Sequence, residues 1–171
     1  MRYIGSKENL LGFIENIVTD SGITGGVFCD LFAGTTTVGR HFKRRGFQII
    51  SNDLMEYSLV FGKAYLENNG FPQFDGLDLP TQFSLFDFDR SRLEQVLAYL
   101  NHLPPEPGFM YENYCDVGTV GKEHSRMYFS AVNAGKIDAV RHQIQLWHDS
   151  RAITDAEFYI LLRCIARKTP L

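Results

Sequence analysis

Apolar residues follow two different spacings in the N-terminal part of the chain. The first group recurs at intervals of three and four residues: Leu10, Leu11, Ile14, Ile17 and Val18. That spacing predicts an amphipathic helix, which Ser6 can cap. Short apolar runs then predict buried strands at residues 27–32 and 47–50, and residues 36–45 predict a helix that ends at Gly46. Strand, helix and strand form a βαβ unit, so a parallel α/β sheet begins here.

Beyond residue 70 the pattern becomes helical and irregular. Ser91 and Glu94 form a capping box, and Thr154 and Glu157 can cap the last helix. Three apolar stripes have helical spacing: Leu93, Val96, Leu97 and Leu100, then Ile137, Val140, Ile144 and Trp147, and finally Phe158, Leu161, Leu162 and Ile165. No internal repeat is present. The expected fold class is therefore α/β, followed by a mainly helical segment.

Composition narrows the class of protein. The 171 residues are 44% hydrophobic and 13% aromatic, enough for a packed core, and the net charge of -3 gives no overall attraction to nucleic acid. Three distant cysteines, Cys29, Cys115 and Cys164, favour reduced thiols, and five histidines without ligand spacing give no metal site. The N-terminus is charged, and no apolar run approaches the roughly 18 residues of a membrane helix. We expect a soluble, cytoplasmic protein with no membrane partner.

The βαβ unit has the layout of a nucleoside site. Gly34 directly follows the first strand, and the amides that begin the next helix suit a polar or anionic group. Asp53 lies 19 residues later, at the tip of the second strand, where an acid can accept hydrogen bonds from ribose hydroxyls. Any parallel α/β protein with a glycine turn would share these features, so both interpretations stay open at this point.

Two nucleotide ligands fit poorly. The spacing of Gly34 and Gly39 is that of a P-loop, but Arg40 and His41 stand where Lys and Ser or Thr should follow. The dinucleotide pattern GxGxxG is also absent, because Thr36 occupies the position of its second glycine. A single small nucleoside beside Phe32 remains, and this favours S-adenosylmethionine.

Three motifs carry a resemblance to a known family. RYIGSK at 2–7, DLFAGTTTVGRHF at 30–42 and NDL at 52–54 resemble the Dam-like class of adenine-specific DNA methyltransferases, and more narrowly its type II restriction-modification members. The resemblance implies S-adenosyl-L-methionine as cofactor and a Rossmann-like methyltransferase fold. It also implies a set of cofactor-binding residues: Tyr3, Lys7, Asp30, Phe32, Gly34, Thr35 and Asp53.

Residues 125–147 and 153–162 are similar to the target-recognition region of the same subgroup. The resemblance thus divides the chain into a cofactor-binding part at 1–70, a target-recognition segment at 71–155 and a return to the core at 156–171. It implies double-stranded DNA as substrate and a cognate restriction endonuclease in the same system. A small-molecule methyltransferase is the less favoured alternative, because the stretch at 119–147 is basic and aromatic.

Several side chains are candidates for DNA contact, since phosphates and displaced bases need cations and aromatic rings: Lys122, Arg126, Tyr128, Lys136 and Arg141. Core packing is the alternative for Tyr128 and its neighbour Phe129, and a solvated helix face is the alternative for the two cations of the following helix. For the basic residues after the cofactor loop we expect solvent exposure: Arg40, Lys43, Arg44 and Arg45.

The family's catalytic motif, DPPY, is not found. The Pro104–Pro105 pair lies between Leu103 and Glu106 in a predicted loop, so no catalytic residue is assigned. We expect a truncated or frame-shifted chain that is inactive unless a second polypeptide supplies the motif. The alternative is a non-catalytic remnant that binds cofactor or DNA. A methyltransferase sheet has about seven strands, and only two strong ones are found here. We therefore expect this chain alone to be marginally stable, prone to aggregation and non-cooperative in its melting.

Overall fold

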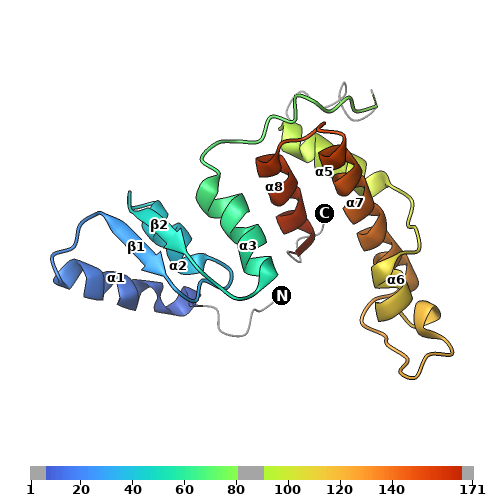
Figure 1. The fold of residues 1–171 in the computed structure, drawn as a ribbon, viewed down its shortest axis with the longest axis horizontal. Coiled ribbons are helices and arrows are strands. Elements are labelled where there is room, and N and C mark those ends of the chain that lie inside the picture. Colours follow the sequence, from blue (N-terminus) through green and yellow to red (C-terminus); the bar gives the residue numbers. More distant parts are fainter. Residues whose placement is uncertain (1–6, 81–90, 167–171) are drawn as a thin grey trace. The chain divides into compact units, whose positions relative to one another are not determined.

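The computed structural model describes residues 7–80 and 91–166 of the chain (Figure 1). The chain divides into two compact units, Met1–Phe71 and Pro72–Leu171. The described part of the first unit contains two strands and the helices around them, and that of the second is built from helices. An α/β protein with a mainly helical second segment is therefore confirmed.

The predicted βαβ unit is present. Strands β1 (Val27–Asp30) and β2 (Gln48–Ser51) pair in parallel, with Val27 opposite Gln48 and Asp30 opposite Ser51. Helix α2 (Thr37–Lys43) connects them and ends before Gly46, whose φ of +85° is the left-handed conformation expected there. Strand β1 is two residues shorter than predicted, because the chain turns away after Asp30.

Aromatic rings fill the core of the α/β unit. Val38, Phe42 and Phe47 are buried, and the ring of Phe28 stacks on that of Phe42 with centroids 4.1 Å apart. A short 3-10 turn, η1 (Glu8–Leu10), leads into α1 (Leu11–Asp20), which packs three residues of its predicted stripe on the same cluster: Leu11, Ile14 and Val18. The proposed cap at Ser6 lies outside the described residues.

Two basic side chains of α2 contact the turn that follows the next helix. After α3 (Glu56–Gly62) the chain forms a π-helical turn, η2 (Lys63–Glu67). The Lys43 ammonium donates to the carbonyls of Tyr65 at 3.0 Å, Leu66 at 2.7 Å and Asn68 at 2.8 Å. The Arg40 guanidinium lies 3.7 Å from the centroid of the Tyr65 ring.

Our expectation of solvent exposure is therefore wrong for two of the four basic residues after the cofactor loop. Arg40 and Lys43 are half-buried, because η2 supplies an aromatic face for Arg40 and backbone carbonyls that accept from Lys43. Arg44 and Arg45 are exposed, as predicted. Arg45 also forms an ion pair with Glu15 of α1.

The helical unit contains α5 (Arg92–His102), α6 (Phe109–Tyr114), a 3-10 turn η3 (Val117–Thr119), α7 (Ala131–Asp149) and α8 (Asp155–Ala166). The predicted apolar stripes meet in one cluster. Its buried members are Phe74, Leu77, Leu79, Val96, Leu100, Val140, Ile144, Ile153 and Leu161. The Pro104–Pro105 pair lies in a loop, as predicted.

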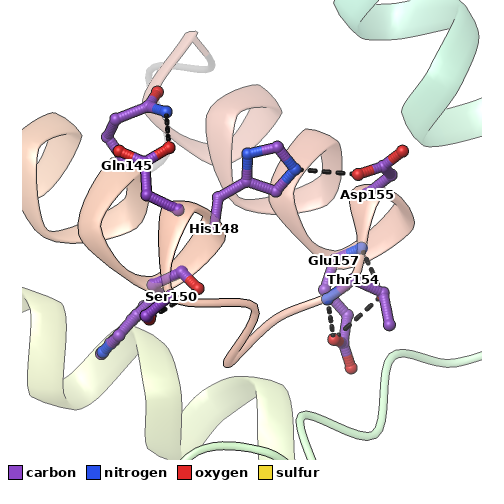
Figure 2. Close-up of polar contacts among 8 residues, drawn as sticks. Gln145, His148, Ser150, Thr154, Asp155 and Glu157 are labelled. Atoms are coloured by element: carbon purple, nitrogen blue, oxygen red, sulfur yellow. Dashed lines mark hydrogen bonds and ion pairs between the residues drawn. The ribbon is translucent and has the colours of Figure 1, made fainter.

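Both predicted capping boxes are confirmed. The Ser91 hydroxyl accepts a hydrogen bond from the Glu94 amide, and the Glu94 carboxylate accepts one from the Ser91 amide at 2.7 Å. Figure 2 shows the second box, where the Glu157 carboxylate accepts from the Thr154 amide at 2.9 Å. The same buried carboxylate also accepts from the Phe74 amide at 2.5 Å, which ties the cap to the core.

Among the residues that the structure describes, no helix is long and apolar enough to cross a membrane. The same residues contain no group of three His, Cys, Asp or Glu side chains placed to hold a metal ion. Cys29 is exposed, Cys115 and Cys164 are buried, and all three carry free thiols.

Candidate cofactor site and DNA-contacting loop

The turn between β1 and α2 has two residues in the left-handed conformation. Gly34 has a φ of +51° and Thr36 a φ of +59°, and both are buried. The Thr36 amide donates to the Ala33 carbonyl at 2.7 Å, and its hydroxyl donates to the Thr35 carbonyl at 2.7 Å. Thr36 occupies the position of the second glycine in the dinucleotide pattern GxGxxG. The backbone there adopts a conformation typical of glycine although the residue is threonine.

Asp53 reaches back to this turn from the end of β2. Its carboxylate accepts hydrogen bonds from the Gly34 amide at 2.7 Å and from the Met55 amide at 3.0 Å. The amides of Met55 and Gly34 hold the pKa of Asp53 below its usual value, because they stabilise the ionised form. The residue predicted to bind ribose therefore also fixes the glycine turn.

Asp30, at the end of β1, is a buried carboxylate with one unused oxygen. Its side chain is 8% exposed, and Oδ1 lies 3.5 Å from the Lys7 ammonium. Within the described part of the chain, Oδ2 has no hydrogen-bond partner. A buried acceptor without a donor is costly, so this oxygen suits a cationic or polar ligand group.

The other predicted cofactor residues lie around the same turn. The Lys7 ammonium donates to the Phe32 carbonyl at 2.6 Å, and the Phe32 ring is largely exposed, with 79% of the residue accessible. The Thr35 hydroxyl lies 3.0 Å from that of Thr37. Tyr3 lies outside the described residues. The structure thus brings Lys7, Asp30, Phe32, Gly34, Thr35 and Asp53 together at the carboxyl ends of the two strands.

Asn52 is a residue of the NDL motif to which the sequence assigns no role. The side-chain amide of Asn52 donates to the Leu31 carbonyl at 3.1 Å. The main-chain carbonyl of Asn52 accepts from the Ala33 amide at 3.0 Å. Asn52 therefore joins the ends of both strands to the turn. The position of Asn52 next to Asp53 in the NDL motif is the sequence feature that could have identified this role.

The candidate DNA-contacting residues lie in the helical unit. Most of them belong to the segment of residues 115–129, called the 115–129 loop below. Lys122, Arg126 and Tyr128 are exposed in it. The guanidinium of Arg126 lies 5.5 Å from the Tyr114 ring centroid, and the Tyr128 ring lies 6.0 Å from the same ring. Core packing does not apply to Tyr128, which is 73% exposed, whereas its neighbour Phe129 is half-buried and bridges to Cys115.

The two predicted DNA residues on α7 differ. The Lys136 ammonium donates to the carbonyls of Leu103 and, at 2.6 Å, of Asn101, so it is half-buried at the end of α5. Arg141 is exposed. Lys136 therefore has partners within the fold, and the alternative of a fully solvated side chain is wrong for it. Arg141 remains accessible to a ligand.

Comparison with known proteins tests the resemblance. The sequence profile of the D12 class N6 adenine-specific DNA methyltransferase family matches residues 3–169. The chain belongs to this family. Over 165 residues it is 38% identical to the type II methyltransferase M.NlaIII of Neisseria lactamica, a match that covers 95% of this chain and 43% of that protein. Our identification of the family from its motifs is confirmed.

Two further relatives are longer still. The modification methylase LlaI of Lactococcus lactis subsp. lactis is 36% identical over 162 residues, which cover 95% of this chain and 24% of that protein. The type II methyltransferase M.FokI of Planomicrobium okeanokoites is 34% identical over 174 residues, with 99% and 24% covered. This D12-class chain thus spans less than half the length of these relatives. No solved structure matches it.

Proposed function

We propose that this chain forms the S-adenosylmethionine-binding part of an adenine-specific DNA methyltransferase of a restriction-modification system. The βαβ unit would be part of a Rossmann-like sheet, and the 115–129 loop would contact duplex DNA. The observation that carries the proposal is the buried, unpartnered oxygen of Asp30 beside an exposed aromatic ring and a turn fixed by Asp53. Family membership and the names of the relatives support the reaction.

The residues present fit this cofactor. The Asp30 oxygen would accept a hydrogen bond from the cofactor's ammonium group, which replaces the missing donor with a charged one. Asp53 stays ionised through its two backbone donors and has lone pairs left for ribose hydroxyls. The exposed Phe32 ring would cover the adenine. When bound, S-adenosylmethionine supplies the methyl group.

Lys7 would position this site rather than only neutralise it. Its ammonium lies 3.5 Å from Asp30 and 2.6 Å from the Phe32 carbonyl, so one side chain joins the acid to the segment that carries the aromatic ring. These two contacts fix the Asp30 side chain relative to Phe32. A charged carboxylate is the form that attracts the cofactor's ammonium group.

The DNA part of the proposal depends on the chemistry of the 115–129 loop. Lys122 and Arg126 provide cations for phosphates, and Tyr128 provides a ring that can stack on a base. Val120 and Met127 are 79% and 80% exposed in the same loop, so it also presents apolar surface. Arg141 extends the cationic candidates onto α7. We leave Lys136 out, because it is half-buried and its ammonium donates to two carbonyls, whereas Lys122 is exposed.

The cofactor site can be tested by calorimetric titration of the full chain. We expect Asp30→Asn to weaken S-adenosylmethionine binding by about tenfold or more, because a charge-assisted hydrogen bond is lost. Methylthioadenosine has no ammonium group, so it should bind the variant and the original chain alike. The exposed Asp20 at the end of α1 provides the control variant Asp20→Asn, which should bind as the original chain does.

Two results would contradict the cofactor proposal. The first is the absence of saturable S-adenosylmethionine binding by the unmodified chain. The second is an equal loss of affinity for both ligands in Asp30→Asn, since that pattern would indicate a disturbed turn rather than a lost ammonium contact.

DNA contact can be tested through the salt dependence of binding to a short duplex. Lys122→Gln and Arg126→Gln should each lower the slope of log affinity against log salt by about one, because each removes one phosphate neutralisation. Arg44 of the α/β unit is also exposed and provides the control Arg44→Gln. Unchanged slopes in both loop variants would exclude this loop as the contact surface.

A further inference from the structure

A buried carboxylate in the middle of α7 holds the first turn of α6. Asp138 is 8% exposed, and its two oxygens accept hydrogen bonds from the Met110 amide at 2.9 Å and the Tyr111 amide at 2.8 Å. The first amides of a helix have no carbonyl within the helix to bond. Asp138 therefore supplies from 27 or 28 residues away the acceptors that an N-cap residue normally supplies locally.

The chain makes room for this contact with a glycine. A Cβ atom at Gly108, the residue before α6, would lie 2.9 Å from the Asp138 carboxyl carbon. Real Cβ atoms do not approach another atom this closely, so a side chain at residue 108 would force the Asp138 carboxylate to shift. The lack of a side chain at Gly108 thus lets the Asp138 carboxylate reach the first amides of α6.

The other end of α6 carries the 115–129 loop. The Tyr114 carbonyl, at the end of α6, accepts from the Tyr128 amide at 3.1 Å and the Phe129 amide at 3.2 Å. The Lys122 ammonium donates to the Glu112 carbonyl. A Cβ atom at Gly118 would lie only 1.9 Å from the Tyr111 carbonyl oxygen, so the start of the loop also rests directly on α6.

Hydrogen bonds inside the loop make it follow α6 as one piece. The Thr119 hydroxyl, in a residue that is 1% exposed, donates to the Cys115 carbonyl at 2.7 Å and accepts from the Arg126 amide at 3.0 Å. The buried Cys115 thiol donates to the Tyr111 carbonyl at 3.0 Å. A shift of α6 would therefore move the whole loop.

We infer that Asp138 is a positioning residue for DNA binding, which fixes the loop cations relative to α7 by holding the start of α6. Asp138 touches no DNA itself. It sets where Lys122, Arg126 and Tyr128 stand relative to the exposed Arg141 of the same helix α7. This inference rests on the proposed contact between the 115–129 loop and duplex DNA.

Asp138→Asn tests the inference with little change in shape. The amide oxygen can still accept from one N–H, whereas the amide nitrogen faces the other N–H and cannot accept. We expect the affinity of the full chain for a short duplex to fall by about tenfold or more and its salt slope to decrease. Amides of the 115–129 loop should exchange with deuterium faster, and S-adenosylmethionine binding should be unchanged.

Thr154→Ala is the matched control, because it weakens the N-terminus of α8 in the same unit and leaves the contacts of α6 intact. It should lower the melting temperature while affinity and salt slope stay within about twofold of the original values. Gly108→Ala is a second variant that presses on the carboxylate without removing it. It should reproduce the loss of DNA affinity if Asp138→Asn does not fold.

The outcomes separate the inference from the function on which it rests. If the unmodified chain shows no salt-dependent DNA binding, the proposed DNA contact fails and the inference fails with it. If the unmodified chain binds DNA and Asp138→Asn binds equally well with the same slope, the DNA contact stands and the inference alone is overturned. A loss of affinity in Thr154→Ala as large as in Asp138→Asn would also overturn it, because stability would then explain both.

Discussion

The two units of this methyltransferase-family chain contain hydrophobic clusters of very different size. In the helical unit, nine buried residues from α5, α7, α8 and neighbouring loops form one cluster. In the α/β unit, the described residues include a cluster of only three buried members, Val38, Phe42 and Phe47. Other large apolar residues there are more than half exposed: Leu10, Phe13, Ile17, Val27 and Ile50.

The difference follows from the geometry of the elements. An amphipathic helix has one apolar stripe, and the stripes of α5, α7 and α8 cover one another. A parallel sheet has two faces and is normally covered on both. Here Phe28 and Ile49 face the cluster beneath α1 and α2, whereas Val27 and Ile50 alternate to the other side and are exposed. We therefore expect the helical unit to be the more stable of the two.

Removal of a core ring from each unit should produce the largest effects. Phe42 is 1% exposed and contacts Phe28 and Phe47, so Phe42→Ala should cost about 3–5 kcal/mol. The three-residue cluster offers little to replace it, and we expect the α/β unit to unfold with loss of S-adenosylmethionine binding. Leu100→Ala in the helical unit should cost about 2–5 kcal/mol and leave that unit folded.

Hydrogen–deuterium exchange of peptides from each unit would measure both variants. Fast exchange in Phe42→Ala confined to residues 7–71 would confirm that the two units differ in stability. Retention of a folded α/β unit in Phe42→Ala, together with unfolding of the helical unit in Leu100→Ala, would reverse the comparison.

A smaller effect is expected at the polar contact between α2 and η2. Lys43→Met keeps the aliphatic stem but removes the donor for three carbonyls, which should destabilise the α/β unit by about 1–3 kcal/mol. Urea unfolding followed by NMR would report each unit separately. The adjacent Arg44 is exposed, so Arg44→Met should leave the midpoint unchanged. Equal midpoints in the two variants would mean that the Lys43 contacts contribute nothing.

The smallest effect is a dependence on acid pH in the α/β unit. The pKa of Asp53 is lowered in the folded chain, so its ionised form stabilises the fold above the usual aspartate pKa of about 3.9. This contribution should be lost as the pH falls through the lower, folded pKa. Asp53→Asn should thus be less stable than the original chain at pH 7, with a difference that shrinks in acid. An equal difference at both pH values would contradict the assignment.

Local signals predicted most of the fold. Gly46 gave the end of α2, and Ser91 with Glu94 gave the start of α5, because caps and stops depend on neighbours in the sequence. The roles of Lys43 and Asp138 could not be predicted in this way. Their partners lie 22 to 28 residues away, and a basic or acidic residue on a helix has the same local pattern whether it meets solvent or a distant backbone.

The candidate site shows the same limit. Asp53 was identified from its position after the second strand, and Asp30 through the family resemblance. The structure adds that Asp30 has an unused oxygen and that Asp53 holds Gly34. Thr36 seemed to break a glycine pattern, yet its backbone adopts a left-handed φ of +59°. A pattern of residue types records such a dihedral angle only indirectly, because glycine is the usual but not the sole residue that adopts it.

The left-handed Thr36 also bears on how a ligand would enter the site. The turn from Ala33 to Thr36 is closed by the chain's own hydrogen bonds, and Asp53 holds its glycine. Ordering a backbone residue costs about 1–2 kcal/mol, and here folding, rather than the arrival of a ligand, meets that cost. The turn is thus preorganised before a ligand binds. Binding then requires little ordering of the backbone, so more of the interaction free energy contributes to affinity.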